Sequence, residues 1–282
     1  NKAGLLLGAL ALSDSGGSSS SGLSTTPEAN SAYDNSHQGI YKGSIVGSSG
    51  TWKLDVDNKG TGAAPVFSYT YTPTGSSTTY SDNVTGSLSG TGPYTLDFSS
   101  TVPGLGVSFT VQIVLSAVGN INSATLTVAG TGVDIRGYKE KSDALIRVFE
   151  GTFSGTTLAS QSVSGVWNMT ITGITNIQSR SKTLKVAGAD CTTECDTSFP
   201  SAALEAGTLK ISSQVTAACG SPQACTCTTT VTSNEGFSIG LMSGTGSWTT
   251  KITTNVGGNC YGSAMAVGTT IVSGTLTGTR TR

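Results

Sequence analysis

Apolar and polar residues alternate along most of the chain with a period of two. In Val66–Thr72, for example, Phe67, Tyr69 and Tyr71 alternate with serine and threonine. This is the pattern of a half-buried β-strand, because successive side chains on a strand point to opposite faces. Glycine, asparagine, aspartate and proline separate many of the runs, so we predict an all-β protein of antiparallel sandwiches or barrels. Similar runs lie at Leu96–Phe98, Val107–Ile113, Ala124–Val128, Val163–Ile171, Leu184–Val186, Leu209–Ile211 and Ile271–Leu276.

The densest run of charge interrupts this pattern near the middle of the chain. Gly137–Arg147 reads GYKEKSDALIR, and we expect a short helical turn there. A chain of 282 residues is long enough for about two domains. We therefore expect two β-domains in tandem behind an extended N-terminal arm. The expected boundaries are 1–40 for the arm, 41–137 for β-domain 1, 138–147 for the junction and 148–282 for β-domain 2.

The first forty residues differ in composition from the rest. Asn1–Leu12 contains one lysine and an apolar run of about ten residues, which is too short to span a bilayer but fits an export signal. A serine- and glycine-rich stretch follows at 15–22. The segment resembles the leader of a bacterial lipoprotein, whose apolar core runs into a short box that ends in a lipidated cysteine. Ser15 stands at the place of that cysteine, and serine cannot form the thioether.

The leucines of this segment need shelter from water if the segment is retained in the mature protein. We expect a neighbouring copy of the chain to accept the arm, as an added strand or as an apolar plug. The alternative is an arm that folds back on its own domain. The expected assembly residues are Leu5, Leu6, Leu7, Leu10 and Leu12.

All three tryptophans of the chain lie in a recurring motif, G-x-W-x-x-x-[VI]. The motif occurs at Gly50–Val56, Gly165–Ile171 and Gly246–Ile252. A strand puts tryptophan and the residue four positions later on one face, so we expect Trp52, Trp167 and Trp248 to be core anchors. The G-x-W element is similar to the first-strand signature of lipocalin-type barrels, in which the tryptophan closes the floor of the barrel. That resemblance implies a meander of antiparallel strands.

Charge is scarce in this sequence, and hydroxyl groups take its place. Charged residues make up 11% of the chain against roughly 25% in ordinary soluble domains. Serine and threonine together number about 86 of the 282 residues. The net charge is -1 and lysine and arginine do not cluster, so no nucleic-acid partner is expected. The composition favours an extracellular or cell-surface protein that contacts copies of itself, a glycan or another surface.

Six cysteines lie in the C-terminal third of the chain. An even number in an exported chain predicts three disulfides, for which 15 pairings exist. A zinc site is disfavoured, because the spacings are C-x3-C and C-x5-C-x-C and the only histidine is far upstream. Two cysteines two positions apart on a strand share a face, so Cys225 and Cys227 should bond to different partners. The cysteines are Cys191, Cys195, Cys219, Cys225, Cys227 and Cys260.

The sequence contains no recognisable catalytic constellation. His37, the only histidine, lies in a polar stretch without a motif for nucleophilic catalysis. Asp55 and Asp57 would share a face of the first tryptophan strand, and with Asn58 they offer oxygen ligands for calcium. The alternative for this pair is a charged edge strand that discourages aggregation. No P-loop, dinucleotide-binding or EF-hand motif is present, so we expect no cofactor, no metal and no enzymatic activity.

Together these features favour a structural or adhesive surface protein that self-assembles into a filament through its N-terminal arm. An alternative is an exported, lipoprotein-like β-barrel that binds a small apolar ligand or a glycan. A hydrolase with two carboxylates is a third hypothesis, but the sequence does not pair the acidic residues.

Overall fold

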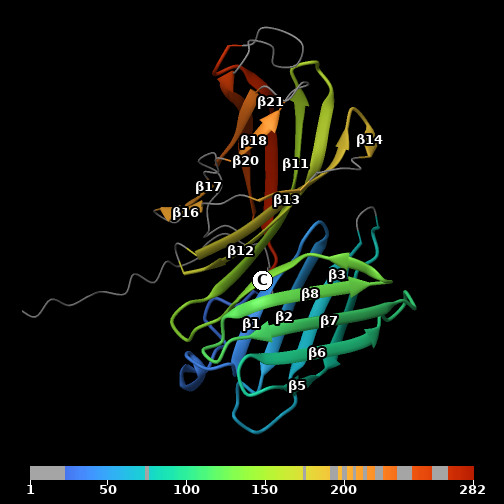
Figure 1. The fold of residues 1–282 in the computed structure, drawn as a ribbon, viewed down its shortest axis with the longest axis vertical. Helices are drawn as coiled ribbons and strands as arrows, with labels where there is room; N and C mark the ends of the chain where they lie inside the picture. The colour runs from blue at the N-terminus through green and yellow to red at the C-terminus, as the bar shows by residue number, and fades with distance from the viewer. Residues whose placement is uncertain are drawn as a thin grey trace, which may run out of the picture.

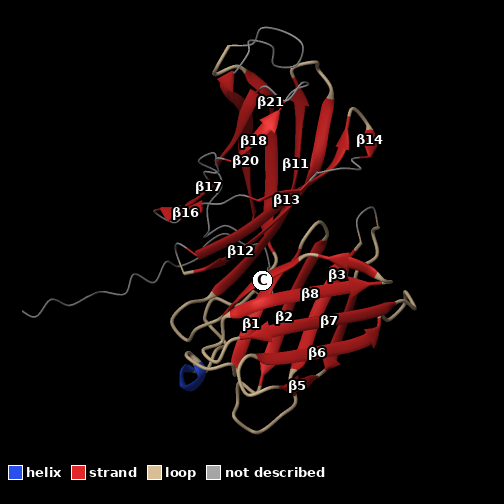
Figure 2. Ribbon diagram, in the orientation of Figure 1, coloured by secondary structure: helices blue, strands red, loops and turns tan. Residues whose placement is uncertain are grey.

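The computed structural model describes residues 23–73, 76–173, 176–190, 196–198, 202–205, 208–211, 215–219, 225–233, 243–255 and 266–282. These residues form an all-β protein whose strands pair antiparallel, which confirms the predicted fold class (Figure 2). The one helical element among them is a 3-10 turn, η1 (Ser31–Tyr33), which Asn30 caps by accepting the backbone N–H of Ala32. In Figure 1 the strands gather into a lower half and an upper half.

The first half is a meander of ten strands in two five-stranded sheets. One sheet has the order β10-β1-β2-β3-β4, and the other has the order β5-β6-β7-β8-β9. The bounds are β1 (Gly39–Ile45), β2 (Ser49–Val56), β3 (Val66–Thr72), β4 (Tyr80–Thr85), β5 (Ser87–Ser89), β6 (Tyr94–Thr101), β7 (Ser108–Leu115), β8 (Ile121–Val128), β9 (Thr131–Val133) and β10 (Ile135–Lys139).

The two sheets continue into each other at both edges. Strand β4 passes into β5 through Gly86, and β9 passes into β10 through Asp134, after which β10 pairs with β1. The meander therefore closes into a flattened barrel whose two layers cross in Figure 1. Gly86 permits the first corner, since a Cβ there would lie 2.4 Å from the Phe98 ring and 2.5 Å from the carbonyl oxygen of Asp97.

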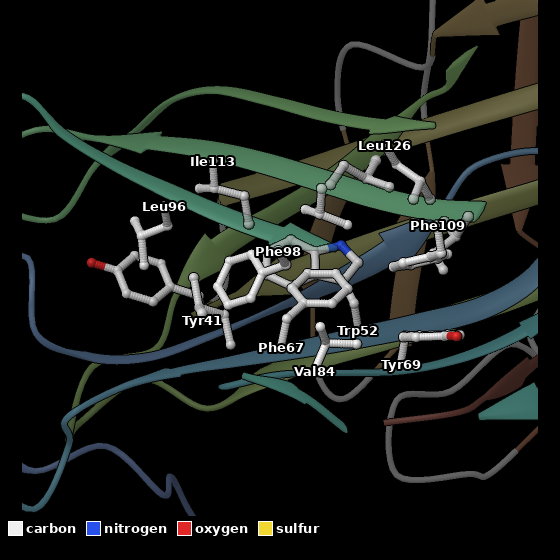
Figure 3. Close-up of a cluster of buried hydrophobic side chains, with 14 of the residues drawn as sticks. Tyr41, Trp52, Phe67, Tyr69, Val84, Leu96, Phe98, Phe109, Ile113 and Leu126 are labelled. Carbon is white, nitrogen blue, oxygen red and sulfur yellow. The ribbon is translucent and has the colours of Figure 1, made fainter. Parts of the chain in front are cut away.

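Aromatic and aliphatic side chains from both sheets fill the interior of this barrel (Figure 3). The Trp52 and Phe67 rings stack with centroids 5.6 Å apart, and the Tyr69 and Phe109 rings stack at 4.1 Å. The alternating run at Val66–Thr72 thus turns Phe67 and Tyr69 into the core. Each aromatic side chain removes about 150–250 Å² from water, so this cluster supplies much of the stability of the barrel.

The second half is built on one long antiparallel sheet with the order β14-β13-β12-β11-β21-β20-β19-β18, and β15 pairs with β13. A separate hairpin joins β16 and β17. The bounds are β11 (Ile146–Thr157), β12 (Ser162–Thr172), β13 (Asn176–Val186), β14 (Ala189–Asp190), β15 (Asp196–Ser198), β16 (Ala202–Glu205), β17 (Thr208–Ile211), β18 (Val215–Cys219), β19 (Cys225–Ser233), β20 (Ser243–Asn255) and β21 (Thr270–Arg280).

The two halves meet on strand β1, which is buried along its whole length. Tyr41 and Ile45 belong to the core of the barrel, whereas Lys42 and Ser44 lie under the second half. Both faces of one barrel strand are thus removed from water, and the outer face is covered by strands β11 and β12.

The expected helical turn at 137–147 is wrong. Residues up to Lys139 belong to strand β10, an isolated bridge joins Lys141 to Ala144, and β11 begins at Ile146. The charges of this stretch do not mark a solvated helix. Glu140 is buried instead, where it contacts the N-terminal strap described below, and Lys139 donates to the carbonyl oxygens of Tyr33 and Ser36.

Candidate functional site

Trp52 lies over a pair of glycines on neighbouring strands. In the barrel sheet Trp52 of β2 is opposite Gly43 of β1, and Gly43 is opposite Gly137 of β10. The indole nitrogen of Trp52 donates to the carbonyl oxygen of Arg136 at 3.2 Å. A Cβ on Gly137 would lie 2.3 Å from the indole ring, so only glycine leaves room for the ring at this position.

Trp167 repeats this arrangement in the second half. Trp167 of β12 is opposite Gly151 of β11, which is opposite Gly278 of β21. The indole nitrogen donates to the carbonyl oxygen of Thr277 at 2.9 Å. A Cβ on Gly151 would lie 2.6 Å from that nitrogen.

The backbone around Trp248 has the same register. Trp248 of β20 is opposite Gly274 of β21, and Gly274 is opposite Gly155 of β11. The side chain of Trp248 lies outside the described residues. In each motif the tryptophan is thus opposite a glycine on the adjoining strand, and that glycine is opposite a second one on a strand distant in sequence, a feature that the motif alone did not reveal.

A buried ion pair holds the junction between the two halves. The Lys42 ammonium lies 2.8 Å from both carboxylate oxygens of Glu140, and the two side chains are 1% and 0% exposed. The Glu140 carboxylate also accepts the backbone N–H groups of Glu28 at 2.7 Å and Ile146 at 3.0 Å. Such additional hydrogen bonds are needed to offset the cost of removing two charges from water.

Glu28 extends this pair into a network that we call the charge clamp, comprising Glu28, Lys42, Lys53 and Glu140. A carboxylate oxygen of Glu28 lies 2.8 Å from the Lys42 ammonium, and the other oxygen contacts the Lys53 ammonium. Burial by itself raises the pKa of Glu28, but hydrogen bonds to the two lysines and their positive charges outweigh it. The resulting pKa is about 2.

The clamp fastens an N-terminal strap, residues Leu23–Asn30, to the barrel, and further hydrogen bonds attach the strap to both halves of the molecule. The backbone N–H of Asn30 donates to the side-chain oxygen of Asn58 at 2.9 Å, and the Asn58 amide donates back to the carbonyl of Glu28 at 3.0 Å. The guanidinium of Arg280, on β21, donates to the carbonyl oxygen of Ser24 at 2.5 Å. The strap thus bonds to the barrel and to the last strand of the second sheet.

A second set of contacts joins the turn between β1 and β2 to the second sheet. Asn168 is buried and accepts the backbone N–H of Gly47 at 3.0 Å, while its amide donates to the carbonyl of Ser48 at 3.1 Å. Burial raises the pKa of Glu150, although hydrogen bonds from Ser49 and Gly50 oppose the shift. These contacts fix the turn against the face of β11 and β12.

Neutralising Glu28 is expected to lower the melting temperature at pH 7. A carboxylate whose folded pKa is depressed contributes stability above its unfolded pKa and loses that contribution as the pH falls through the folded value. The difference in melting temperature between the wild type and Glu28→Gln should therefore reach its full size above pH 4.5 and disappear toward pH 2. Thermal melts across this range test it, with Asp143→Asn at an exposed turn position as control. A difference in melting temperature that does not change with pH would show that the ionised Glu28 carboxylate is not its cause.

The acidic residues proposed for calcium serve as turn caps. The Asp57 carboxylate accepts the backbone N–H groups of Thr61 at 2.7 Å and Gly62 at 3.0 Å, and Asp55 accepts that of Asn58 at 2.9 Å. Among the described residues, no group of three or more histidine, cysteine, aspartate or glutamate side chains is placed to hold a metal ion.

His37 packs its ring against an aromatic neighbour. Its centroid lies 3.6 Å from that of Tyr94, and its carbonyl oxygen accepts the Tyr41 hydroxyl at 2.7 Å. Burial and the positive charge of Lys139 lower the pKa of His37. The ring is thus held in a stacked position at one end of the barrel.

Several predicted residues lie outside the described part of the chain. These include the five arm leucines, Leu5, Leu6, Leu7, Leu10 and Leu12, together with Cys191, Cys195 and Cys260. For Cys219, Cys225 and Cys227 the structure describes the backbone strands alone. The sequence analysis did not predict the charge clamp. The one feature that could have indicated it is Lys42, a lysine in the otherwise uncharged strand Gly39–Ile45.

The fold and its clamp thus define an all-β protein of two joined halves, with an N-terminal strap bound to both. No family model, no curated protein and no solved structure matches this chain. No helix within the described ranges has the length and apolar character needed to cross a membrane.

Proposed function

We propose that the chain is a non-catalytic extracellular structural protein, a subunit of a surface filament or fibre that self-assembles through its N-terminal arm. In this proposal the leucines at 5–12 leave their own subunit and are buried in a neighbouring copy. The low charge and the hydroxyl-rich surface support a location outside the cell.

The strap is the observation that carries this proposal. Residues 1–22 lead directly into it, so a pull on the arm acts first on Leu23–Asn30. The strap bonds to β1 and β2 through Glu28, to the loop after β2 through Asn30, and to β21 through the Ser24 carbonyl. Tension would therefore be shared between both halves, which is what a subunit linked by its arm requires.

The alternative of a barrel that binds a small apolar ligand has less support. Such a barrel needs an open interior, since ligand pockets occupy roughly 300–1,000 Å³. Here Trp52, Phe67, Phe98 and Phe109 meet at the centre of the barrel and fill it (Figure 3). A glycan would need exposed aromatic rings to stack on, but in the aromatic run at Phe67–Tyr71 both Phe67 and Tyr69 are in the core.

Electron microscopy of the purified chain tests the proposal. At high concentration the full chain is expected to form filaments. A variant with Leu5, Leu6, Leu7, Leu10 and Leu12 all replaced by serine keeps the length of the arm but removes its apolar surface, and it should stay dispersed. Circular dichroism should show the same β-content in both proteins. Dispersed monomers of the full chain would refute the proposal.

A further inference from the structure

Two of the six cysteines occupy directly opposed positions at one end of a hairpin. Strands β18 (Val215–Cys219) and β19 (Cys225–Ser233) pair antiparallel, and the register sets Cys219 opposite Cys225. In the same register Cys227 is opposite Ala217. This hairpin lies at the edge of the long sheet, because β18 is the last strand in the sheet order.

The backbone register places Cys219 at different Cα distances from Cys225 and Cys227. Directly opposed residues of an antiparallel pair have Cα atoms about 4.5–5.5 Å apart. Disulfides bridge Cα atoms roughly 4.4–6.8 Å apart. Cys219 and Cys227 are diagonal neighbours, which lie about 7–8 Å apart. All three positions lie on one face of the sheet, so it is the shorter Cα separation of opposed residues that favours a bond between Cys219 and Cys225 over one between Cys219 and Cys227.

We propose that Cys219 and Cys225 form a disulfide that closes the β18–β19 hairpin. Cys227 must then pair outside this hairpin, with Cys191, Cys195 or Cys260. Of the 15 pairings that six cysteines allow, three remain. The inference does not depend on the proposed function, because it rests on register alone.

The bond would fix the register of an edge strand. A slip of one residue turns every side chain of a strand to the other face, and an unprotected edge can pair with foreign strands. A covalent link between opposed residues prevents the slip and so keeps the edge strand in its native register. Because the closed loop is short, the disulfide constrains the unfolded chain little, and its removal should leave the protein folded.

Formation follows ordinary thiol–disulfide exchange. One cysteine thiolate attacks the disulfide of an oxidant, either a small-molecule or a protein disulfide, and releases one oxidant thiolate. The thiolate of the second cysteine then attacks the mixed disulfide, forms the Cys219–Cys225 bond and releases the other oxidant thiolate. Two cysteine thiols thus lose two electrons and two protons, and the oxidant disulfide is reduced to two thiols.

Thiol labelling of single variants tests the pairing. Chain purified from an oxidising compartment, denatured without reductant and treated with a maleimide, should carry no label. Cys219→Ser should carry one label, placed on Cys225 by peptide mass spectrometry, and Cys225→Ser should carry one on Cys219. The matched control Cys227→Ser should carry its label on Cys191, Cys195 or Cys260.

Several outcomes would overturn the assignment. A label on any cysteine other than Cys225 in the Cys219→Ser protein is one, and labelling of all six cysteines in the wild type is another. A Gln223→Arg substitution gives an independent readout, because trypsin then cuts between the two strands. In the Cys227→Ser background, where the second fragment keeps Cys225 as its one cysteine, the two fragments should stay linked until a reductant is added, and separation without reductant would contradict the bond.

Discussion

Replacing Trp52 with alanine is expected to lower the free energy of unfolding by about 3–5 kcal/mol, the range for large aromatic residues in a core. Trp52 is fully buried, stacks on Phe67 and donates a hydrogen bond to the carbonyl of Arg136. Removal of the ring leaves a cavity over Gly137, which has no side chain of its own to fill it. Folded domains are stable by only about 5–15 kcal/mol, so this loss would bring the protein close to unfolding.

Urea unfolding followed by circular dichroism measures this effect without relying on tryptophan fluorescence. Val118→Ala is the matched control, since the Val118 side chain is 54% exposed and its truncation should cost less than about 0.5 kcal/mol. Gly137→Ala tests the same contact from the other side, and overpacking should cost about 1–3 kcal/mol. A Trp52→Ala protein as stable as Val118→Ala would show that the indole is not an anchor.

Replacing Lys42 with methionine is expected to cost about 3–5 kcal/mol, because it leaves the Glu140 carboxylate buried without its partner. The pair is almost fully removed from water, so solvent cannot compensate. The variant should also loosen the strap, since Glu28 loses its contact with the same ammonium. Proteolysis within Leu23–Asn30 should therefore become faster, in addition to the shift in urea midpoint.

An exposed ion pair provides the control for this measurement. Arg136 and Asp134 lie 3.0 Å apart with both side chains 38% exposed, and Arg136→Gln should change stability by less than about 1 kcal/mol. Combining Lys42→Met with Glu140→Gln should recover part of the loss, because the buried carboxylate charge is then gone. If Lys42→Met costs no more than Arg136→Gln, the clamp does not hold the junction.

The strands were predictable from sequence where a local pattern determines them. Alternation marked Val66–Thr72 and Val107–Ile113, and both became strands with one face in the core. Alternation did not predict that β1 would be buried on both faces. That burial depends on Glu140 and Ile146, which come from a segment about a hundred residues away, and no local periodicity contains that information.

The error at Gly137–Arg147 has the same origin. A dense run of charge is ordinarily a solvated face, and it favoured a helical turn. Here Glu140 is completely buried because Lys42 and two backbone N–H groups compensate its charge. The glycines beneath the tryptophans were missed for a related reason. Gly278 comes near Trp167 because β21 pairs with β11 and β11 pairs with β12 in a particular register. The spacing of residues in the sequence does not specify that register.

The most direct test of arm-linked assembly is a titration of the full chain with a form that begins at residue 23. The shortened form keeps the body that receives an arm but has none to donate, so it should end every filament that it joins. Substoichiometric amounts are therefore expected to shorten filaments in proportion to the amount added, as measured by electron microscopy. Filament lengths that do not respond to the shortened form would contradict the account.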